Sequence, residues 1–462
     1  MNKGLGLAVS KMRAEGIDER AITVFEDFYR QLVEGVRGTI AETEIAPLTD
    51  VPRFAGQRFS DEERSAALAQ VAVIKLNGGL GTSMGARGAK SALPVRDGAS
   101  FLDIIARQVL DLRARFGASL PLILMNSFRT HEESLKVLSA YPDLPVDGLP
   151  LDFIQSAEPK LRADDLTPVE WPPDPSLEWC PPGHGDLYVS LLATGLLDDL
   201  VTRGIRYAFV SNADNLGATC DPDLAAWVIG EQVPFLAEVC QRSANDRKGG
   251  HFARRRGDDR IILREKAMLE PGDEDAFQDI ERHRFFNTNS LWIDLAVLRA
   301  KLAELGGVLG LPMMVNHKHV DPTRPDSPEV IQIESAMGTA IGTFDGAQVL
   351  EVGRDRFRPV KTTNELLLLR SDVFEIDDHA VLHSTTGRPD PAIRLGASYT
   401  HVGAFDARFP EGVPSLRECT SLTVDGDVTF GAHVRCLGDV VVRGSGTVPA
   451  GAHLAGEVEV SS

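Results

Sequence analysis

The spacing of apolar side chains along the first part of the chain changes from helical to strand-like. Within residues 1–60, side chains such as Ile22, Phe25 and Phe28 recur three or four positions apart, as on one face of an amphipathic helix. The almost continuous apolar run at 71–76 is instead typical of a strand buried on both faces. We therefore expect an N-terminal helical segment that leads into a buried sheet.

Strand and helix patterns alternate after this first strand. Short apolar runs at 120–125, 205–210 and 235–239 predict further strands. Between the first two of these, Ser100 and Asp103 have the spacing of a capping box, which predicts the start of a helix. Alternation of this kind favours an α/β fold with a mostly parallel sheet.

A proline-rich segment interrupts the alternation. Residues 157–182 contain seven of the 27 prolines, which predicts a long, rigid loop. Long loops inside compact domains usually have a function. His184 follows this segment between Gly183 and Gly185, and two flanking glycines favour a close approach of the backbone to a ligand.

The end of the chain follows a third spacing. Apolar side chains recur every six residues in two registers: Val428, Val434 and Val440, then Val442, Val448, Leu454 and Val460. A six-residue repeat is typical of a parallel β-helix, in which we expect the members of a register to stack in one core column. Antiparallel hairpins are the alternative interpretation, and the regular period favours the β-helix.

The strongest chemical signal is the glycine-rich segment directly after the first strand. Residues 76–91, LNGGLGTSMGARGAKS, hold five glycines within eleven positions, and Lys90 follows them. Glycines after a parallel strand let backbone N–H groups surround an anion, and a lysine adds a mobile positive charge. The segment lacks the Walker motif, because Ala89 separates Gly88 from Lys90, and it also lacks the dinucleotide motif G-x-G-x-x-G. It predicts a phosphate site without identifying the nucleotide.

Composition and charge narrow the range of partners. The 462 residues carry 48 Lys and Arg against 67 Asp and Glu, and this net charge of −19 argues against a nucleic-acid binder. The five cysteines are widely spaced and odd in number, as expected of reduced thiols. The sequence shows neither a membrane-spanning apolar run nor a signal-peptide pattern. We therefore expect a cytoplasmic protein of about two to four domains with no nucleic-acid or membrane partner.

A carboxylate stands beyond the strand predicted at 205–210. Ligands of open α/β sheets bind at the carboxyl ends of the strands, where Asp214 is expected to lie. One carboxylate together with substrate phosphates is a usual site for Mg²⁺, whereas a helix N-cap is the other common role of such an aspartate. The glycine-rich segment beside it favours the metal.

The glycine-rich segment resembles the signature of the eukaryotic-type UTP–glucose-1-phosphate uridylyltransferases, also called UDP-glucose pyrophosphorylases. Further blocks of the same family follow in order over about residues 60–460. They are LMNSF at 124–128, PPGHGD at 181–186, SNADNLGAT at 211–219, KGG at 248–250, FNTN at 286–289, IQIE at 331–334, RFRPVKTT at 356–363 and LTVDGDVTFG at 422–431. So many collinear blocks are far more specific than any one of them.

The resemblance implies a fold and a reaction. The implied fold is α/β, a Rossmann-like nucleotidyltransferase of the glycosyltransferase-A type with a mixed sheet, followed by a left-handed parallel β-helix. We expect a helical segment at 1–60, a catalytic domain at 61–385 and a β-helix domain at 386–462. The implied reaction is the Mg²⁺-assisted transfer of the uridylyl group of UTP to glucose 1-phosphate, which gives UDP-glucose and pyrophosphate. Contacts of a homo-oligomer are expected in the C-terminal domain.

The resemblance also implies site residues. Lys90 and Lys361 are expected to be catalytic, acting on the phosphates, and Asp214 is expected to hold Mg²⁺. The implied UTP site comprises Leu76, Asn77, Gly78, Gly79, Lys90, Gln155, Gly183, Asp214 and Lys361. The implied glucose 1-phosphate site comprises Gly78, Gly79, His184, Asn212, Ala213, Asp214, Asn289 and Glu334. Gln155 is expected to contact the uracil edge, because an amide can both donate and accept.

Two departures and two alternatives accompany this assignment. Ala89 stands where the family usually has proline, and Ser290 where it often has a second asparagine. The alternative within the class is a UDP-N-acetylhexosamine pyrophosphorylase, whose loop arginine is replaced here by the pair at 83–84. The alternative from another class is a non-catalytic assembly protein, which would be expected to lose the charged site groups that this chain keeps.

Overall fold

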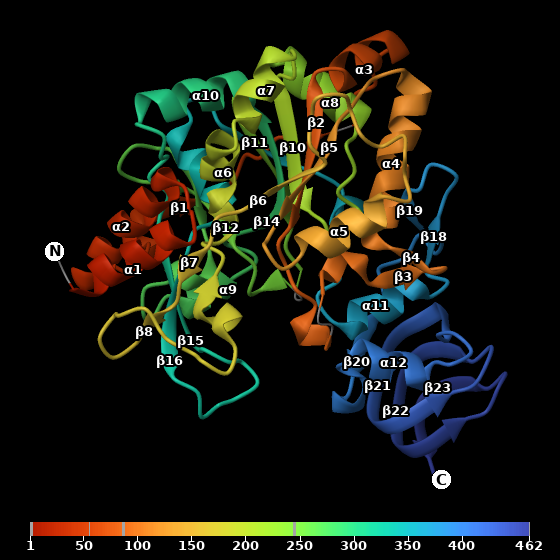
Figure 1. The fold of residues 1–462 in the computed structure, drawn as a ribbon. Coiled ribbons are helices and arrows are strands. Elements are labelled where there is room, and N and C mark those ends of the chain that lie inside the picture. The colour runs from red at the N-terminus through yellow and green to blue at the C-terminus, as the bar shows by residue number, and fades with distance from the viewer. Residues whose placement is uncertain (1–2, 55, 86–87, 244–245, 462) are drawn as a thin grey trace.

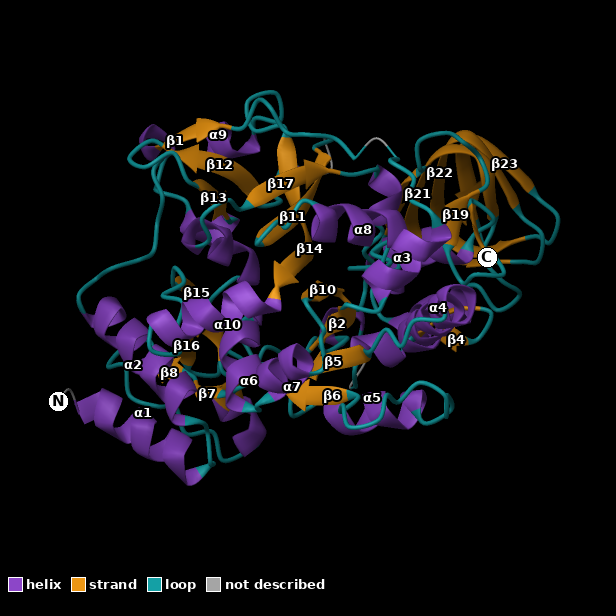
Figure 2. Cartoon of the chain, turned by 90° about the horizontal axis from the view of Figure 1, so that it is seen from above, coloured by secondary structure: helices purple, strands orange, loops and turns teal. Residues whose placement is uncertain are grey.

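The computed structural model describes residues 3–54, 56–85, 88–243 and 246–461. Residues 86 and 87 of the glycine-rich segment therefore lie outside the described part. A central sheet is covered by helices on both faces, and the N-terminal helices and the C-terminal strands lie on opposite sides of it (Figures 1 and 2). None of the described helices is long and apolar enough to cross a membrane.

The central sheet is mixed, which confirms the mixed sheet that the resemblance implies, whereas the mostly parallel sheet predicted from the alternation of strands and helices is wrong. β2 (Val71–Asn77) pairs in parallel with β10 (Tyr207–Asn212) and with β5 (Leu122–Asn126), as the apolar runs indicate. β14 (Phe285–Asp294), however, runs antiparallel to both β10 and β11 (Phe235–Gln241). The apolar pattern could not show this direction, because both faces of the sheet are buried and strands of either direction are then uniformly apolar.

The order of strands in the central sheet is β1–β12–β14–β10–β2–β5–β6, with β11 also paired to β14, β17 paired to β11, and β13 paired to β12. The strands not yet given are β1 (Ile45–Pro47), β6 (Asp152–Ile154), β12 (His251–Arg255), β13 (Ile261–Arg264) and β17 (Gln348–Glu351). β2, β5 and β10 therefore end side by side at one edge, and the site is built at this edge.

Helices bury the two faces of the sheet in separate clusters. One cluster contains residues of α3 (Asp61–Leu68), α4 (Phe101–Phe116), α5 (His131–Leu138), α8 (Pro222–Gly230) and α11 (Thr363–Arg370). The other contains residues of α6 (Leu187–Ala193), α7 (Leu196–Thr202) and α10 (Leu295–Glu304). α9 (Glu274–Gln278) lies in the excursion between β13 and β14. The predicted capping box at Ser100 is confirmed, since its Oγ accepts a hydrogen bond from the Asp103 N–H at 3.2 Å.

The N-terminal helices pack on a small second sheet. α1 (Lys3–Ala14) and α2 (Glu19–Val33) bury their apolar faces against β8 (Leu161–Arg162) and β16 (Glu329–Glu334), and β15 (Met314–His319) completes this sheet. The helical prediction for residues 1–60 is confirmed for the described residues up to Val33, and it is wrong at Ile45–Pro47, where β1 joins the central sheet.

The proline-rich segment 157–182 is more ordered than the predicted loop. It contains β8 and the antiparallel pair β7 (Glu158–Pro159) and β9 (Trp179–Cys180). Two-residue strands leave no periodic pattern, so the prolines dominated the prediction.

The C-terminal strands are parallel and lie in chain order. They are β20 (Ala392–Leu395), β21 (Ser415–Phe430), β22 (Arg435–Val448) and β23 (His453–Val460). The expected six-residue columns are wrong, because Val424 lies opposite Val442 and Phe430 opposite Val448. Six residues of strand advance about 20 Å, whereas paired strands are about 5 Å apart, so residues six apart cannot stack.

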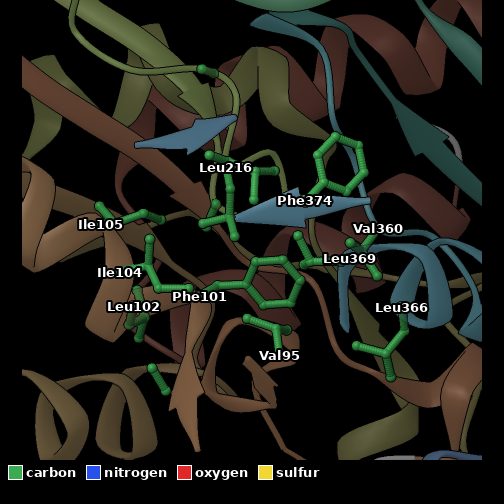
Figure 3. Packing of buried hydrophobic residues seen from close by; sticks show 14 of the residues in the cluster. Val95, Phe101, Leu102, Ile104, Ile105, Leu216, Val360, Leu366, Leu369 and Phe374 are labelled. Carbon is green, nitrogen blue, oxygen red and sulfur yellow. The ribbon is translucent and has the colours of Figure 1, made fainter. Parts of the chain in front are cut away.

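The apolar interior of these strands is continuous with the central core. Leu422 and Val440 belong to the same buried cluster as Phe101 of α4 and Leu366 of α11. Figure 3 shows side chains from residues 360–374 packing against α4 at this junction. Two short strand pairs and one helix complete the described strands and α-helices. They are β3 (Pro94–Arg96) with β4 (Ala99–Ser100), β18 (Phe374–Ile376) with β19 (Leu382–Ser384), and α12 (Val402–Arg408).

Candidate active site

A cavity of about 300 Å³ lies at the carboxyl ends of β2, β5 and β10. Eleven of the fourteen residues assigned by resemblance line it: Leu76, Asn77, Gly78, Gly79, Lys90, Gln155, Gly183, His184, Asn212, Ala213 and Asp214. These residues come from four segments that are far apart in the sequence. The position agrees with the general rule that ligands of α/β sheets bind beyond the carboxyl ends of the strands.

The described part of the glycine-rich segment folds back on itself. The N–H of Lys90 donates to the carbonyl of Gly79 at 3.2 Å, and the N–H of Gly81 donates to the carbonyl of Gly88 at the same distance. Lys90 is therefore carried back to the end of β2, next to the first glycines of the segment. This places a positive side chain beside exposed backbone, which suits a phosphate ligand.

Lys90 and Asp214 form the central charged pair of the cavity. The Lys90 Nζ lies 2.6 Å from the Asp214 Oδ2, and only 14% and 21% of the two side chains are exposed. Each charge is compensated by the other, so the pair is stable in the free protein. A triphosphate and a cation entering the cavity would provide new partners for both groups.

The donor set at Asp214 fits a divalent cation that brings other ligands with it. Among the described residues, no group of three or more His, Cys, Asp or Glu side chains is arranged to hold a metal. Mg²⁺ is usually bound by one or two carboxylates together with substrate phosphates and water. Asp214 alone therefore suits Mg²⁺ in company with a nucleotide and does not suit a permanently bound structural metal.

Asp214 lies in the segment 211–219, called the 211–219 loop below, which consists of the last two residues of β10 and the turn after them. This loop is tied to the segment that carries Lys361. The N–H of Val360 donates to the carbonyl of Asp214 at 3.1 Å. The Asn215 Oδ1 accepts from the N–H of Arg358 at 2.8 Å, and its Nδ2 donates to the carbonyl of Arg356 at 3.2 Å. Two segments more than 130 residues apart in the chain are thus joined by one main-chain bond and by the side chain of Asn215.

His184 is held as a neutral ring. Its Nδ1 accepts a hydrogen bond from the N–H of Met337 at 2.9 Å, so the proton of the neutral ring is on Nε2. Desolvation by the surrounding protein lowers the pKa of His184 to about 4. The ring can therefore donate a hydrogen bond into the cavity at neutral pH, but it is not charged there.

Gly183 is required by its surroundings. Its φ is +79°, and a Cβ at this position would lie 2.5 Å from the carbonyl oxygen of Ser335. Any other residue would be strained and would push against the backbone. The glycine thus keeps the loop of His184 close to residues 334–335, and it explains the Gly-His-Gly pattern in the sequence.

Gln155 and Asn77 supply amide groups on the side of the cavity near β5. The main-chain N–H of Gln155 donates to the carbonyl of Asn126 at 2.8 Å, while its side-chain amide lies against Gly78 and has no hydrogen bond within the described residues. Asn77 donates through Nδ2 to Asn126 and to Ser134, both at 2.7 Å. The Nδ2 of Asn77 is thus occupied by protein acceptors, and the free amide of Gln155 is the more available group.

Three of the assigned residues do not line the cavity. Lys361 is exposed one residue beyond Val360, and Glu334 lies 3.7 Å from the Nζ of Lys318. Asn289 sits at a bulge of β14 with a φ of +57°, and its Oδ1 accepts from the Nδ2 of Asn287 at 2.8 Å. Asparagine adopts a left-handed φ more readily than any residue type except glycine and aspartate, which suits Asn289 to this bulge. The roles of all three stay predictions.

The cavity also has lining residues that the sequence analysis missed. They are Ser91, Met125 and Pro181. The Oγ of Ser91 is buried without a hydrogen-bond partner in the described structure. Each of the three lies inside a segment that the sequence had singled out (76–91, 124–128 and 181–186), although none of them was assigned a role.

A larger hollow of about 560 Å³ lies elsewhere, around Arg64 and Asp223. None of the residues assigned by resemblance lines it. Its main charged groups are already paired, with the Arg64 Nε 2.7 Å from the Asp223 Oδ1. Size therefore does not identify the site, and the convergence of glycines, amides and charges does.

Comparisons with known proteins agree with this geometry. The family model for UTP–glucose-1-phosphate uridylyltransferase matches residues 22–436. The UTP–glucose-1-phosphate uridylyltransferase of Solanum tuberosum is 38% identical over 402 residues, which cover 86% of this chain and 80% of that protein. The enzyme of the same name from Hordeum vulgare is 39% identical, over 82% of this chain and 78% of its own length.

Solved structures extend the similarity to the whole chain. A UDP-glucose phosphorylase from Trypanosoma brucei is 42% identical with a TM-score of 0.92, and the match covers 99% of this chain and 100% of the other. A UDP-glucose pyrophosphorylase variant from Leishmania major, in complex with UDP-glucose, is 38% identical with the same TM-score, and both chains are fully covered. The chain belongs to the UTP–glucose-1-phosphate uridylyltransferase family.

Proposed function

We propose that the protein transfers the uridylyl group of UTP to glucose 1-phosphate and releases pyrophosphate, giving UDP-glucose. The observation that carries this proposal is one cavity in which the Lys90–Asp214 pair lies with the free amide of Gln155. The charged pair suits the phosphates, and the amide suits the edge of a nucleobase. Membership of the family supports the same reaction.

The chemistry requires positioning and charge stabilisation more than acid–base catalysis. A phosphate oxygen of glucose 1-phosphate attacks the α-phosphorus of UTP, and the bond from that phosphorus to the bridging oxygen of pyrophosphate breaks. The attacking oxygen is already ionised at neutral pH, so no general base is needed. His184 agrees with this, because its Nδ1 already accepts the Met337 N–H and its Nε2 carries the proton. Lys90, and Lys361 if it reaches the phosphates, would stabilise the negative charge that builds up on them.

Mg²⁺ is the cofactor that we propose. Asp214 would hold it together with oxygens of the nucleotide, and Asn212 and Ala213 would contact the sugar phosphate beside it. When bound, the ion would neutralise phosphate charge and orient the phosphates. Lys90 could then leave Asp214 and contact a phosphate instead.

The assay that tests this function measures pyrophosphate release with a panel of nucleotides and sugar 1-phosphates. We expect the highest rate with UTP and glucose 1-phosphate, and loss of the rate when divalent cations are chelated. A preference for ATP, or for N-acetylglucosamine 1-phosphate over glucose 1-phosphate, would contradict the assignment. The cytoplasm remains the predicted compartment.

We further propose that residues 386–462 form a left-handed parallel β-helix, with a catalytic domain at 61–385 and an N-terminal segment at 1–60 that is helical up to Val33. The parallel ladders from β20 to β23 and their apolar interior support the β-helix. β23 pairs on one side only within the described residues, so its free edge could bind a second copy of this chain. Light scattering of the whole chain and of a chain ending before residue 386 would test this contact. Equal assembly of both would contradict it.

A further inference from the structure

Lys75 is a buried cation directly behind the cavity. It lies on β2 with 2% of its surface exposed, and it does not line the cavity. Its Nζ donates to the Oγ of Ser211 at 2.7 Å and to the carbonyl of Ala218 at 2.7 Å. Ser211 is the next-to-last residue of β10 and Ala218 lies near the far end of the 211–219 segment, so one side chain ties the strand end before Asp214 to the far end of the loop that follows it.

Arg356 also holds this loop, at its last residue. Its guanidinium donates to the carbonyl of Thr219 at 3.0 Å and makes two hydrogen bonds of 2.7 Å to the carboxylate of Glu238. Glu238 is fully buried and also accepts from the indole N–H of Trp292 at 2.9 Å. A rigid, buried ion pair therefore fixes the position of the loop's last residue.

The placement of these groups is energetically costly. Burial lowers the pKa of Lys75 to about 7, even though Glu238 stabilises its charge. A buried charged or polar group is tolerated only where strong partners compensate its lost hydration. A methionine would fill the same space without the cost of burying an amine, but it would leave the Ala218 carbonyl and the Ser211 hydroxyl without this donor.

The loop is also packed against the segment that carries Lys361. Leu216 of the loop and Val360 belong to the same buried cluster, and Figure 3 shows both side chains near Phe374 and Leu369. Together with the bond between Val360 and Asp214, this packing transmits the position of the loop to Lys361. Fixing the loop therefore fixes both the acidic and the basic side of the phosphate site.

We propose that Lys75 and Arg356 are positioning residues that clamp the two ends of the 211–219 loop and thereby hold Asp214 in register with Lys361. This inference rests on the proposed function, because it assigns the loop to the reacting phosphates. Neither residue touches substrate, and each acts through the loop. Changes to such outer partners of metal-binding and catalytic groups typically cost about 10- to 100-fold in activity or metal affinity.

The main test compares Lys75→Met with Arg113→Met. Arg113 is the matched control, because it also donates to main-chain carbonyls (Leu120, Asp143 and Leu144) but lies away from the cavity. We expect Lys75→Met to lower kcat about 10- to 100-fold, with the KM for UTP within about threefold of the wild type, because binding groups outside the loop remain. Arg113→Met is expected to keep kcat within about twofold of the wild type.

Hydrogen exchange gives a readout that does not depend on turnover. The backbone amides of residues 211–219 should exchange faster in Lys75→Met than in the wild type. In Arg113→Met they should exchange at the wild-type rate. Ser211→Ala, which removes only one of the two bonds of Lys75, should give intermediate changes and serves if Lys75→Met does not fold. Wild-type kcat and unchanged exchange in Ser211→Ala and Lys75→Met would overturn the clamp. Absence of turnover in the wild type would instead contradict the proposed function.

Discussion

Two regions of the molecule are assembled from the chain in different ways. They are the cavity at the ends of β2 and β10 and the stack of β20–β23. The cavity collects side chains from segments between 76 and 214, which the sheet brings together, and its central contact is a single ion pair. The stack uses consecutive strands between residues 392 and 460, and each strand pairs with the next one in the chain. Its contacts are mostly apolar and repeated. A single substitution in the cavity should therefore impair turnover, whereas a single substitution in the stack should lower the free energy of unfolding.

The largest expected effect tests the stack. Phe430 is fully buried, and its ring lies 5.1 Å from that of Phe409. Phe430→Ala should lower the free energy of unfolding by about 3–5 kcal/mol, because it leaves a cavity in the core. Turnover measured well below the unfolding temperature should be unchanged. Leu7→Ala, at an exposed position, is the control, and a large loss of turnover in folded Phe430→Ala would show that the two regions are not separable.

The second prediction tests the ion pair of the cavity. Lys90→Ala and Asp214→Ala should each lower kcat by about a hundredfold or more, the effect of losing one preorganised charge stabiliser. The free energy of unfolding in urea should change much less in these two variants than in Phe430→Ala. Asp223→Ala removes a carboxylate of similar exposure that pairs with Arg64 outside the cavity, and it should keep normal turnover. Near-normal turnover in Lys90→Ala would exclude the lysine from the reaction.

The third prediction concerns Lys361, which is exposed and does not line the cavity. Lys361→Ala should lower kcat by about 10- to 100-fold if the side chain reaches the phosphates once substrate is bound. Lys301→Ala, on α10, is the matched control and should have no effect on kcat. Equal rates in the two variants would show that the position seen in the free protein is also the working position.

The fourth prediction concerns the choice of base. Gln155→Ala should reduce the ratio of kcat/KM for UTP to that for CTP by about tenfold, because a lost amide no longer discriminates the base edge. Gln155→Glu has the same shape but has lost the N–H donors, so it separates the two hydrogen-bonding roles of the amide. An unchanged ratio in both variants would assign base selection to another residue.

The smallest expected effect is a dependence of stability on pH. The pKa of His184 is lowered from 6.5 to about 4, so the unfolded chain binds a proton more readily than the folded one between these values. Stability from the neutral ring is present above about pH 6.5 and is lost as the pH falls toward 4. His184→Asn should therefore lose less stability than the wild type between pH 7 and pH 5 in urea unfolding. Parallel losses in both proteins would contradict a buried neutral ring.

Features that depend on local sequence patterns could be predicted in both regions. The strands β2, β5, β10 and β11 and the cap at Ser100 are local patterns, and they were predicted to within a few residues. The site was predicted through the glycines and the collinear blocks, and most of these residues meet at the cavity. In the stack, the six-residue repeat identified the buried positions but not their partners, because stacking depends on the length of a whole coil.

Other features depend on tertiary context that no local pattern carries. The antiparallel direction of β14 and the left-handed backbone at Asn289 are set by neighbouring strands. Lys75 looks like an exception within an apolar run, and only the structure shows that it holds a loop 136 residues away. Buried polar groups of this kind are therefore the hardest part of a site to find from sequence.

The pairing of β21 with β22 has a consequence for how this chain could be altered. Partners such as Val424 and Val442 are 18 residues apart over most of the β21–β22 pairing, and the same spacing begins the β22–β23 pairing before a register shift shortens it to 16. Duplicating 18 residues should add a layer and keep every side chain on its own face, whereas adding one residue would turn the following side chains to the opposite face. The end of the molecule is therefore a place where length can change in whole layers, for instance to attach a new surface, while the cavity is left untouched.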